Sequence, residues 1–193
     1  MKLVLASGSP RRREILAALG LVFEVRPTGA DETPREGERA PELALRIARA
    51  KCEAASIDPE AAFLAADTVV DVDGVPLNKP ENDDDARRML ALLSGRAHAV
   101  HTGIAVGVRG IVHARSVTTE VVFRALDAGV VDRYVASGEG RDKAGAYGIQ
   151  GMGAGLVLEV RGSPSNVIGL PAAETLALLV ERGVIPCWPP EPR

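Results

Sequence analysis

The sequence predicts a protein of the α/β class, and three observations indicate it. The apolar run Lys2-Leu3-Val4-Leu5-Ala6 is typical of a strand, and the tight loop Ser7-Gly8-Ser9-Pro10 leads from it into a helix. Patterns typical of strands and of helices then recur along the chain. With 193 residues, of which 46% are hydrophobic, the chain can bury one core or two lobes. Because no repeat or low-complexity linker divides it, we expect one domain over residues 1–193.

The first predicted helix begins with the features of an anion-binding site. Ser9 suits the N-cap and a proline follows it, so the amides of Arg11 and Arg12 remain free at the helix start. Arginines in the first turn oppose the helix dipole unless an anionic ligand compensates them. At about 100° per residue, Arg12 shares the packing face with Leu16, whereas Arg13 points away. The alternative is a solvated basic first turn.

Composition limits the function classes. A net charge of −3 argues against a broad basic surface for polymeric nucleic acid, and 3% aromatic residues are too few for base-stacking platforms. The sequence has no apolar run of about 18 residues and no signal-peptide pattern at its start, so we expect a cytoplasmic protein without a membrane partner. Cys52 and Cys187 lack metal or disulfide spacing, and we assign neither a role.

The remaining elements follow from hydrophobic periodicity and from turn residues. Asp73-Gly74 is a hairpin turn signal, and Arg109-Gly110 separates the two alternating runs of a long antiparallel hairpin. The predicted strands are 22–25, 63–70, 97–108, 111–123 and 156–160, and the predicted helices begin at Pro41 or span 83–93, 128–136 and 172–180.

Two charged residues interrupt apolar patterns. Lys51 lies in the centre of the apolar stripe of the helix that begins at Pro41, so it either snorkels out at the helix end or reaches into a site. Asp67 interrupts the buried-strand pattern of residues 63–70. Because burial of a lone carboxylate is costly, we expect Asp67 to be paired, metal-bound or at a strand end that faces a cleft. A satisfied structural aspartate is the alternative.

A glycine-rich stretch and two histidines are the remaining candidates for a site. The stretch from Asp142 to Gly151 alternates small residues with polar or aromatic ones, which suits close approach of the backbone to a ligand. His98 and His101 have an odd spacing on a predicted strand, so they point to opposite faces and do not make a paired metal site. We interpret both histidines as structural.

The chain offers two dispersed carboxylates, Glu32 and Asp67, and a set of cations at loop or element ends. If these groups converge, they suit a polyphosphate, because triphosphate chemistry needs positive charge around the non-bridging oxygens, a metal held by carboxylates and a group that orients the attacking water. The motifs of P-loop, dinucleotide-binding and serine hydrolase enzymes are absent from the sequence. The cations are Arg11, Arg12, Lys51, Lys79 and Lys143.

In the order of its motifs, the chain resembles the Maf family of house-cleaning nucleoside triphosphate pyrophosphatases. The resemblance implies a Maf/ITPase-like α/β fold, with an elongated, curved, mixed sheet flanked by helices and two lobes with a central nucleotide cleft. The motifs that carry it are Ser7 to Arg12, Asp31-Glu32, Lys51, Ala66-Asp67-Thr68, Lys79-Pro80, Leu93-Ser94-Gly95, Asp142 to Gly151 and Gly169-Leu170-Pro171.

The resemblance also implies an activity, a metal-dependent cut between the α- and β-phosphates that yields a nucleoside monophosphate and pyrophosphate. Asp67 matches the residue assigned as proton acceptor, and together with Glu32 it is expected to hold Mg²⁺ or Mn²⁺. The resemblance further implies a homodimer and a link to septum formation and arrest of cell division. The positions that match phosphate contacts are Ser7, Ser9, Arg11, Arg12, Lys51, Lys79 and Lys143.

Three positions indicate the subgroup. Arg11, Thr68 and Gln150 match the members that act on dTTP and UTP, whereas the group that prefers 7-methyl-GTP has Trp, Gln and Glu there. The resemblance therefore implies pyrimidine nucleotides, canonical or modified, as substrates, read in part by Thr68 and Gln150. The rival hypothesis is a non-catalytic regulator of division that binds nucleotides at the same anion site. Retention of Asp67 beside a full set of cations favours the enzyme.

Overall fold

The computed structural model of the chain describes residues 1–56 and 58–189. Its strands form one seven-stranded sheet in the order β2-β1-β3-β5-β6-β7, with β4 paired to β3. The strands are β1 (Lys2–Leu5), β2 (Glu24–Val25), β3 (Ala61–Val72), β4 (Val75–Leu77), β5 (Ala97–Val108), β6 (Ile111–Phe123) and β7 (Val157–Arg161). The helices are α1 (Pro10–Ala18), α2 (Ala40–Ala55), α3 (Asp83–Leu93), α4 (Ala128–Ser137), α5 (Pro164–Ile168) and α6 (Ala172–Glu181), with 3₁₀ turns η1 (Ala144–Ala146) and η2 (Gly151–Leu156).

The sheet is mixed, which confirms the predicted α/β class. β1 runs parallel to both β2 and β3, whereas β3, β5, β6 and β7 pair in antiparallel fashion. β3, β5 and β6 are the long strands, with 12, 12 and 13 residues, and they extend through the whole molecule. A strand of this length rises about 40 Å, so one sheet can support separate groups of helices at its two ends.

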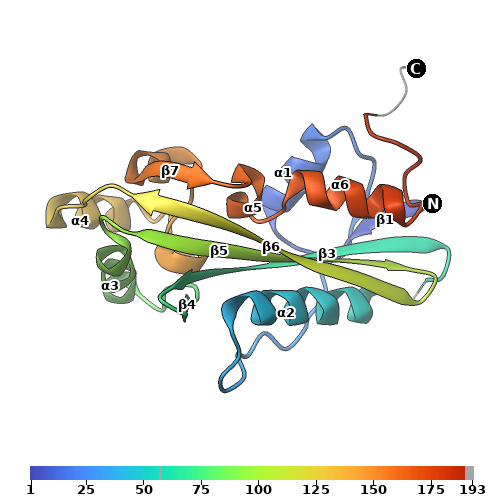
Figure 1. The fold of residues 1–193 in the computed structure, drawn as a ribbon, viewed down its shortest axis with the longest axis horizontal. Coiled ribbons are helices and arrows are strands. Elements are labelled where there is room, and N and C mark those ends of the chain that lie inside the picture. Colours follow the sequence, from blue (N-terminus) through green and yellow to red (C-terminus); the bar gives the residue numbers. More distant parts are fainter. Residues whose placement is uncertain (57, 190–193) are drawn as a thin grey trace.

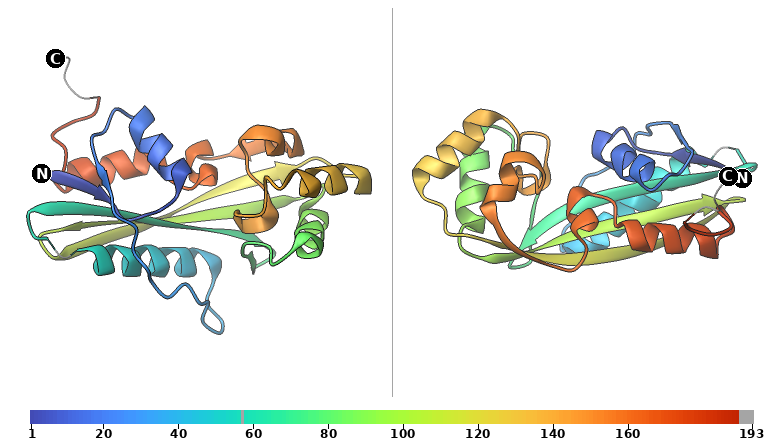
Figure 2. Two further views of the ribbon diagram at one scale, coloured as in Figure 1. Left: turned by 180° about the vertical axis from the view of Figure 1, so that it is seen from behind. Right: turned by 90° about the horizontal axis from the view of Figure 1, so that it is seen from above.

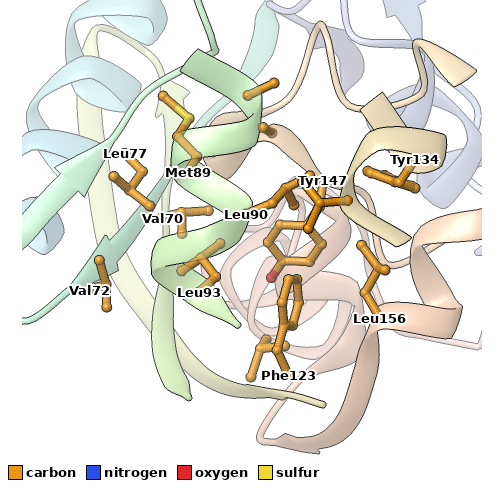
Figure 3. Close-up of a cluster of buried hydrophobic side chains, with 14 of the residues drawn as sticks. Val70, Val72, Leu77, Met89, Leu90, Leu93, Phe123, Tyr134, Tyr147 and Leu156 are labelled. Carbon is orange, nitrogen blue, oxygen red and sulfur yellow. The ribbon is translucent and has the colours of Figure 1, made fainter. Parts of the chain in front are cut away.

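The helices cover the sheet in two groups (Figures 1 and 2). Near the chain termini, α2 packs on one face of the long strands, and α1 and α6 cover the other. At the far end, α3, α4 and the 3₁₀ turns enclose a separate apolar cluster, in which the rings of Phe123 and Tyr147 meet edge to face with centroids 4.7 Å apart (Figure 3). This arrangement confirms the expectation of two lobes on one elongated sheet.

Local sequence signals explain most of the element boundaries. The helix α3 begins where the Asn82 side chain accepts a hydrogen bond from the Asp85 amide, and α4 begins in the same way at Asp127. In the turn between β5 and β6, Arg109 and Gly110 both have positive φ, as a two-residue hairpin turn requires. Strands 97–108 and 111–123 and helix 83–93 have the predicted bounds.

The structure differs from the sequence-based expectations at three places. Strand β2 has only two residues, because it pairs with β1 only at Glu24 and Val25, and Val22 at its expected start is exposed. Helix α5, which was not predicted, is a single short turn capped by the Ser163 side chain. Ser9 occupies the N-cap of α1, but its side chain makes no capping hydrogen bond there. No helix among the described residues is long and apolar enough to span a bilayer.

Candidate active site

A cavity of about 620 Å³ opens between the two groups of helices. Its walls come from the start of α1, the loop before α2, α2 itself, β3, the residues after β4, the glycine-rich stretch and the end of α5. Every predicted site residue lines this one cavity, although their individual roles stay predictions. These residues are Ser7, Ser9, Arg11, Arg12, Glu32, Lys51, Asp67, Thr68, Lys79, Lys143 and Gln150.

Lys51 and Asp67 form the centre of the site. The Lys51 ammonium donates to Asp67 Oδ1 at 2.7 Å and also lies 2.8 Å from Glu32 Oε1. The side chains of Lys51 and Asp67 are 11% and 14% exposed, whereas that of Glu32 is 55% exposed. Lys51 thus reaches into the site instead of snorkelling to the helix end, and Asp67 is a paired carboxylate that faces the cleft.

The surroundings of Asp67 change its acidity. Burial raises the pKa of the Asp67 carboxyl above its ordinary value, even though Lys51 and Arg12 favour the charged form. A carboxylate of higher pKa is a better proton acceptor, since general-base efficiency rises as the pKa approaches the working pH. The cavity therefore contains a partly desolvated carboxylate of raised pKa beside the Lys51 ammonium.

Arg12 binds the walls of the cavity together. Its Nε donates to Gly169 O at 2.9 Å, Nη1 to Ala66 O at 2.7 Å and to Ser7 Oγ at 3.1 Å, and Nη2 to Thr68 Oγ1 at 3.3 Å. These bonds join the loop after β1, strand β3 and the residue after α5. Because a guanidinium has five N–H donors, at most one of them remains for a ligand.

Arg11 and Lys143 share one carboxylate, that of Asp142. Asp142 accepts from Arg11 Nη1 at 2.9 Å and from Lys143 Nζ at 2.6 Å. Burial alone raises the pKa of Asp142, but these two partners outweigh it and lower the pKa to about 2. Asp142 was not among the predicted site residues, although it begins the stretch from Asp142 to Gly151 that the sequence marks as a ligand-binding loop.

Thr68 and Gln150, the residues proposed to contact the base, differ in how firmly the structure holds their side chains. The Thr68 hydroxyl is fixed by Thr102 Oγ1 at 2.9 Å, and Thr102 is in turn held by Asn166 O at 3.0 Å. Gln150 is exposed at the rim, where its side chain makes no hydrogen bond to the described chain. Thr102 and Asn166 are buried supports that the sequence analysis did not identify. Thr102 is a polar residue in an alternating strand, and Asn166 lies in the short helix α5, so neither has a distinguishing pattern.

The donor set fits a hard divalent cation of the magnesium type. Within the described ranges no three His, Cys, Asp or Glu side chains come together as a ready-made metal cage. Glu32 and Asp67 nevertheless converge on the same lysine nitrogen. One or two carboxylates, with water and substrate phosphates completing the shell, are the usual protein ligands of Mg²⁺.

The histidines take structural positions. His98 Nε2 lies 2.8 Å from the Tyr147 hydroxyl, and His101 Nδ1 lies 2.8 Å from Thr118 Oγ1. Both rings are buried, and burial lowers the pKa of each, to about 4 for His98. Neutral rings with such partners support the structural interpretation.

Proteins of known name match nearly the whole chain. A dTTP/UTP pyrophosphatase of Anaeromyxobacter dehalogenans is 50% identical over 97% of this chain and 97% of its own. One of Sphingopyxis alaskensis is 48% identical over 94% of this chain and 97% of its own. Among solved structures, a nucleoside-triphosphatase or dITP/XTP pyrophosphatase of Mycobacterium abscessus is 17% identical, with a TM-score of 0.44 over 95% of each chain. The profile of Maf-like proteins matches residues 2–182, and the chain therefore belongs to the Maf family.

Proposed function

We propose that this protein is a nucleoside triphosphate pyrophosphatase that hydrolyses dTTP and UTP, and modified pyrimidine nucleotides of the same shape, to the monophosphate and pyrophosphate. The observation that carries the proposal is the pair of Lys51 and Asp67, 2.7 Å apart at the centre of a cavity lined by further cations. Relatives about 50% identical over nearly the whole chain bear the name dTTP/UTP pyrophosphatase, which supports this choice of substrate.

Each group in the cavity has a defined task under this proposal. Asp67 accepts the proton of the attacking water, and its raised pKa suits that task. Lys51 fixes the Asp67 carboxylate and adds positive charge beside the reacting phosphate. Arg12 maintains the shape of the cavity through its bonds to β3 and Gly169. Phosphate contacts are assigned to Ser7, Ser9, Arg11, Arg12, Lys51, Lys79 and Lys143.

The metal is part of the proposal. Glu32 and Asp67 would hold Mg²⁺ or Mn²⁺, which when bound supplies Lewis-acid stabilisation of the phosphate charge. A requirement for the ion is checked by removing it with a chelator, which should stop turnover, and by restoring it with excess Mg²⁺ or Mn²⁺.

The base is assigned to Thr68 and Gln150. A glutamine amide carries a donor and an acceptor, so it can match the N3–H and a carbonyl of uracil or thymine with two hydrogen bonds. Thr68 is fixed by Thr102 and by Arg12, and it lines the same cavity. Arg11 completes the set of three positions that the dTTP and UTP subgroup shares.

The decisive experiment follows the products of dTTP by phosphorus NMR. Purified protein with Mg²⁺ should release dTMP and pyrophosphate together, and Asp67→Asn, which keeps the size of the side chain, should slow turnover by about 10² or more. Early accumulation of dTDP with orthophosphate would refute the position of the cut. Tight nucleotide binding without turnover would favour the rival, a non-catalytic regulator of division.

Three further expectations rest on the family resemblance alone. They are a homodimer, a cytoplasmic location and a part in arresting septum formation. Light scattering of the purified protein measures the first, and fractionation and microscopy of cells with altered levels of the protein measure the other two.

A further inference from the structure

Glu139 organises the glycine-rich loop although it does not line the cavity. Its Oε1 accepts from the Gly153 amide at 2.8 Å and from the Tyr134 hydroxyl at 3.0 Å. Its Oε2 accepts from the Met152 amide at 2.9 Å. One carboxylate, which follows α4, thus holds the C-terminal side of the loop that carries Gln150.

Tyr134 holds the other side of the same loop. Its hydroxyl accepts from the Gly148 amide at 3.1 Å while donating to Glu139. The residue is 5% exposed and belongs to the apolar cluster shown in Figure 3, so the position of the hydroxyl is fixed by packing. Gln150 therefore lies between two anchored points, Gly148 and Met152, and both anchors lead to the pair of Tyr134 and Glu139.

The loop is folded closely around this pair. Gly151 has φ +66°, and a Cβ added there would lie 2.5 Å from Glu139 Oε2. A Cβ on Gly153 would lie 1.9 Å from Gly148 O and 2.9 Å from the Tyr134 hydroxyl. All three distances are shorter than van der Waals contact allows, so glycine at both positions permits this approach of the backbone to the two side chains.

The charge of Glu139 strengthens the arrangement. Burial tends to raise the pKa of the carboxyl, but the amides of Gly153 and Met152 and the Tyr134 hydroxyl lower it below its ordinary value. The group therefore remains ionised at neutral pH. Hydrogen bonds to an ionised acceptor are about twice as strong as those between neutral groups.

We propose that Tyr134 and Glu139 are positioning residues that set the conformation of loop 148–153 and thereby the selectivity of the cavity for uracil and thymine. The inference rests on the proposed function, because it assigns the reading of the base to Gln150. Neither side chain touches the nucleotide. The pair acts by holding Gln150 in register with the base edge, and it leaves the centre at Lys51 and Asp67 unchanged.

The test compares Tyr134→Phe and Glu139→Gln with the wild type. Tyr134→Phe keeps the packed ring and removes the hydroxyl, whereas Glu139→Gln keeps the shape and places an amide group against a backbone donor. The matched control is Glu159→Gln on β7, whose carboxylate bonds, among the described residues, only to Arg161 at the surface. The readouts are kcat/KM for UTP and for CTP, and amide hydrogen exchange at 148, 152 and 153.

We expect both variants to lower the ratio of kcat/KM for UTP over CTP by about tenfold, mainly through KM for UTP, and to leave CTP turnover nearly unchanged. Exchange at the three amides should accelerate by about tenfold or more, while the control changes neither quantity. A ratio of kcat/KM that stays at the wild-type value overturns the inference, whether or not the amides exchange faster. Unchanged exchange rates at the three amides overturn it as well. A wild type that cleaves neither UTP nor dTTP overturns the proposed function itself, which distinguishes the two failures.

Discussion

Replacing Lys51 by Met tests the electrostatic centre of the cavity. The change keeps an unbranched apolar stem on the packed face of α2 and removes the ammonium that contacts Asp67 at 2.7 Å and Glu32 at 2.8 Å. The Asp67 side chain, which is 14% exposed, then remains without its principal cation. Arg12 still acts on Asp67 through space. From the helix pattern alone stability should hold, but these contacts indicate that it falls.

The size of the loss follows from the burial. Removing one partner of a buried ion pair costs about 3–5 kcal/mol, because the other charge stays buried. Lys51 and Asp67 retain 11% and 14% exposure, so we expect the lower end of this range, about 3 kcal/mol at pH 8. Glu32, at 55% exposure, adds little.

The loss should depend on pH in a defined direction. Without Lys51 the pKa of Asp67 in the folded protein lies still further above its unfolded value, so the folded state binds a proton more readily than the unfolded state as the pH falls. Protonated Asp67 needs no cation. The difference in unfolding free energy between wild type and Lys51→Met should therefore shrink between pH 8 and pH 5.

Urea denaturation at the two pH values, together with kcat/KM for dTTP, measures the effect. Arg49→Met is the matched control, because Arg49 is exposed on the same helix and loses, within the described part of the chain, only a weak bond to Val112 O at 3.4 Å. Adding Asp67→Asn to Lys51→Met should restore most of the stability but none of the activity. A loss that is equal at both pH values, or that Asp67→Asn fails to relieve, would show that Lys51 serves packing alone.

Three other changes address separate parts of the molecule. Burial lowers the pKa of His98 to about 4, below its unfolded value, so stability is lost as the pH falls. The unfolding free energy measured with urea should be about 2–3 kcal/mol lower at pH 4.5 than at pH 7.5 because of this group, and His98→Gln should remove that difference. Gln150→Glu should lower the ratio of kcat/KM for UTP over 7-methyl-GTP about ten- to a hundredfold, because a carboxylate meets a base carbonyl; an unchanged ratio means that other residues read the base. Arg46 binds the Glu38 carboxylate through two nitrogens at 2.6 and 2.8 Å and thereby fixes the loop that carries Glu32. Arg46→Met should therefore lower kcat/KM about tenfold with a small change in melting temperature. Unchanged kcat/KM would contradict this role.

Local signals in the sequence were sufficient for most of the fold. The acidic start and the Ser94-Gly95 end of helix 83–93 act within one turn of the chain, and the Arg109-Gly110 turn fixes the register of the strands beside it. Each of these signals depends on neighbours in the sequence. The short helix α5 was not predicted, because five residues are too few to show a helical period.

The composition of the site was predictable, but its internal bonding was not. The cations were expected at loop or element ends and the two carboxylates were dispersed along the chain, and the family resemblance indicated which of these groups converge. The pairing of Arg11 with Asp142 joins residues 131 positions apart, and the four bonds of Arg12 reach three separate segments. Such contacts depend on the tertiary arrangement of the strands, which cannot be predicted from the charges of neighbouring residues in the sequence.

The two kinds of ion pair in the cavity should respond differently to a polyphosphate. Asp142 is 62% exposed, and exposed pairs contribute about 0–1 kcal/mol, so Arg11 and Lys143 can exchange this carboxylate for phosphate oxygens at little cost. The pair of Lys51 and Asp67 is largely buried, and separating it costs several times more. Asp142 can thus hold two cations in place until the anion arrives, whereas the pair of Lys51 and Asp67 should resist exchange for phosphate oxygens.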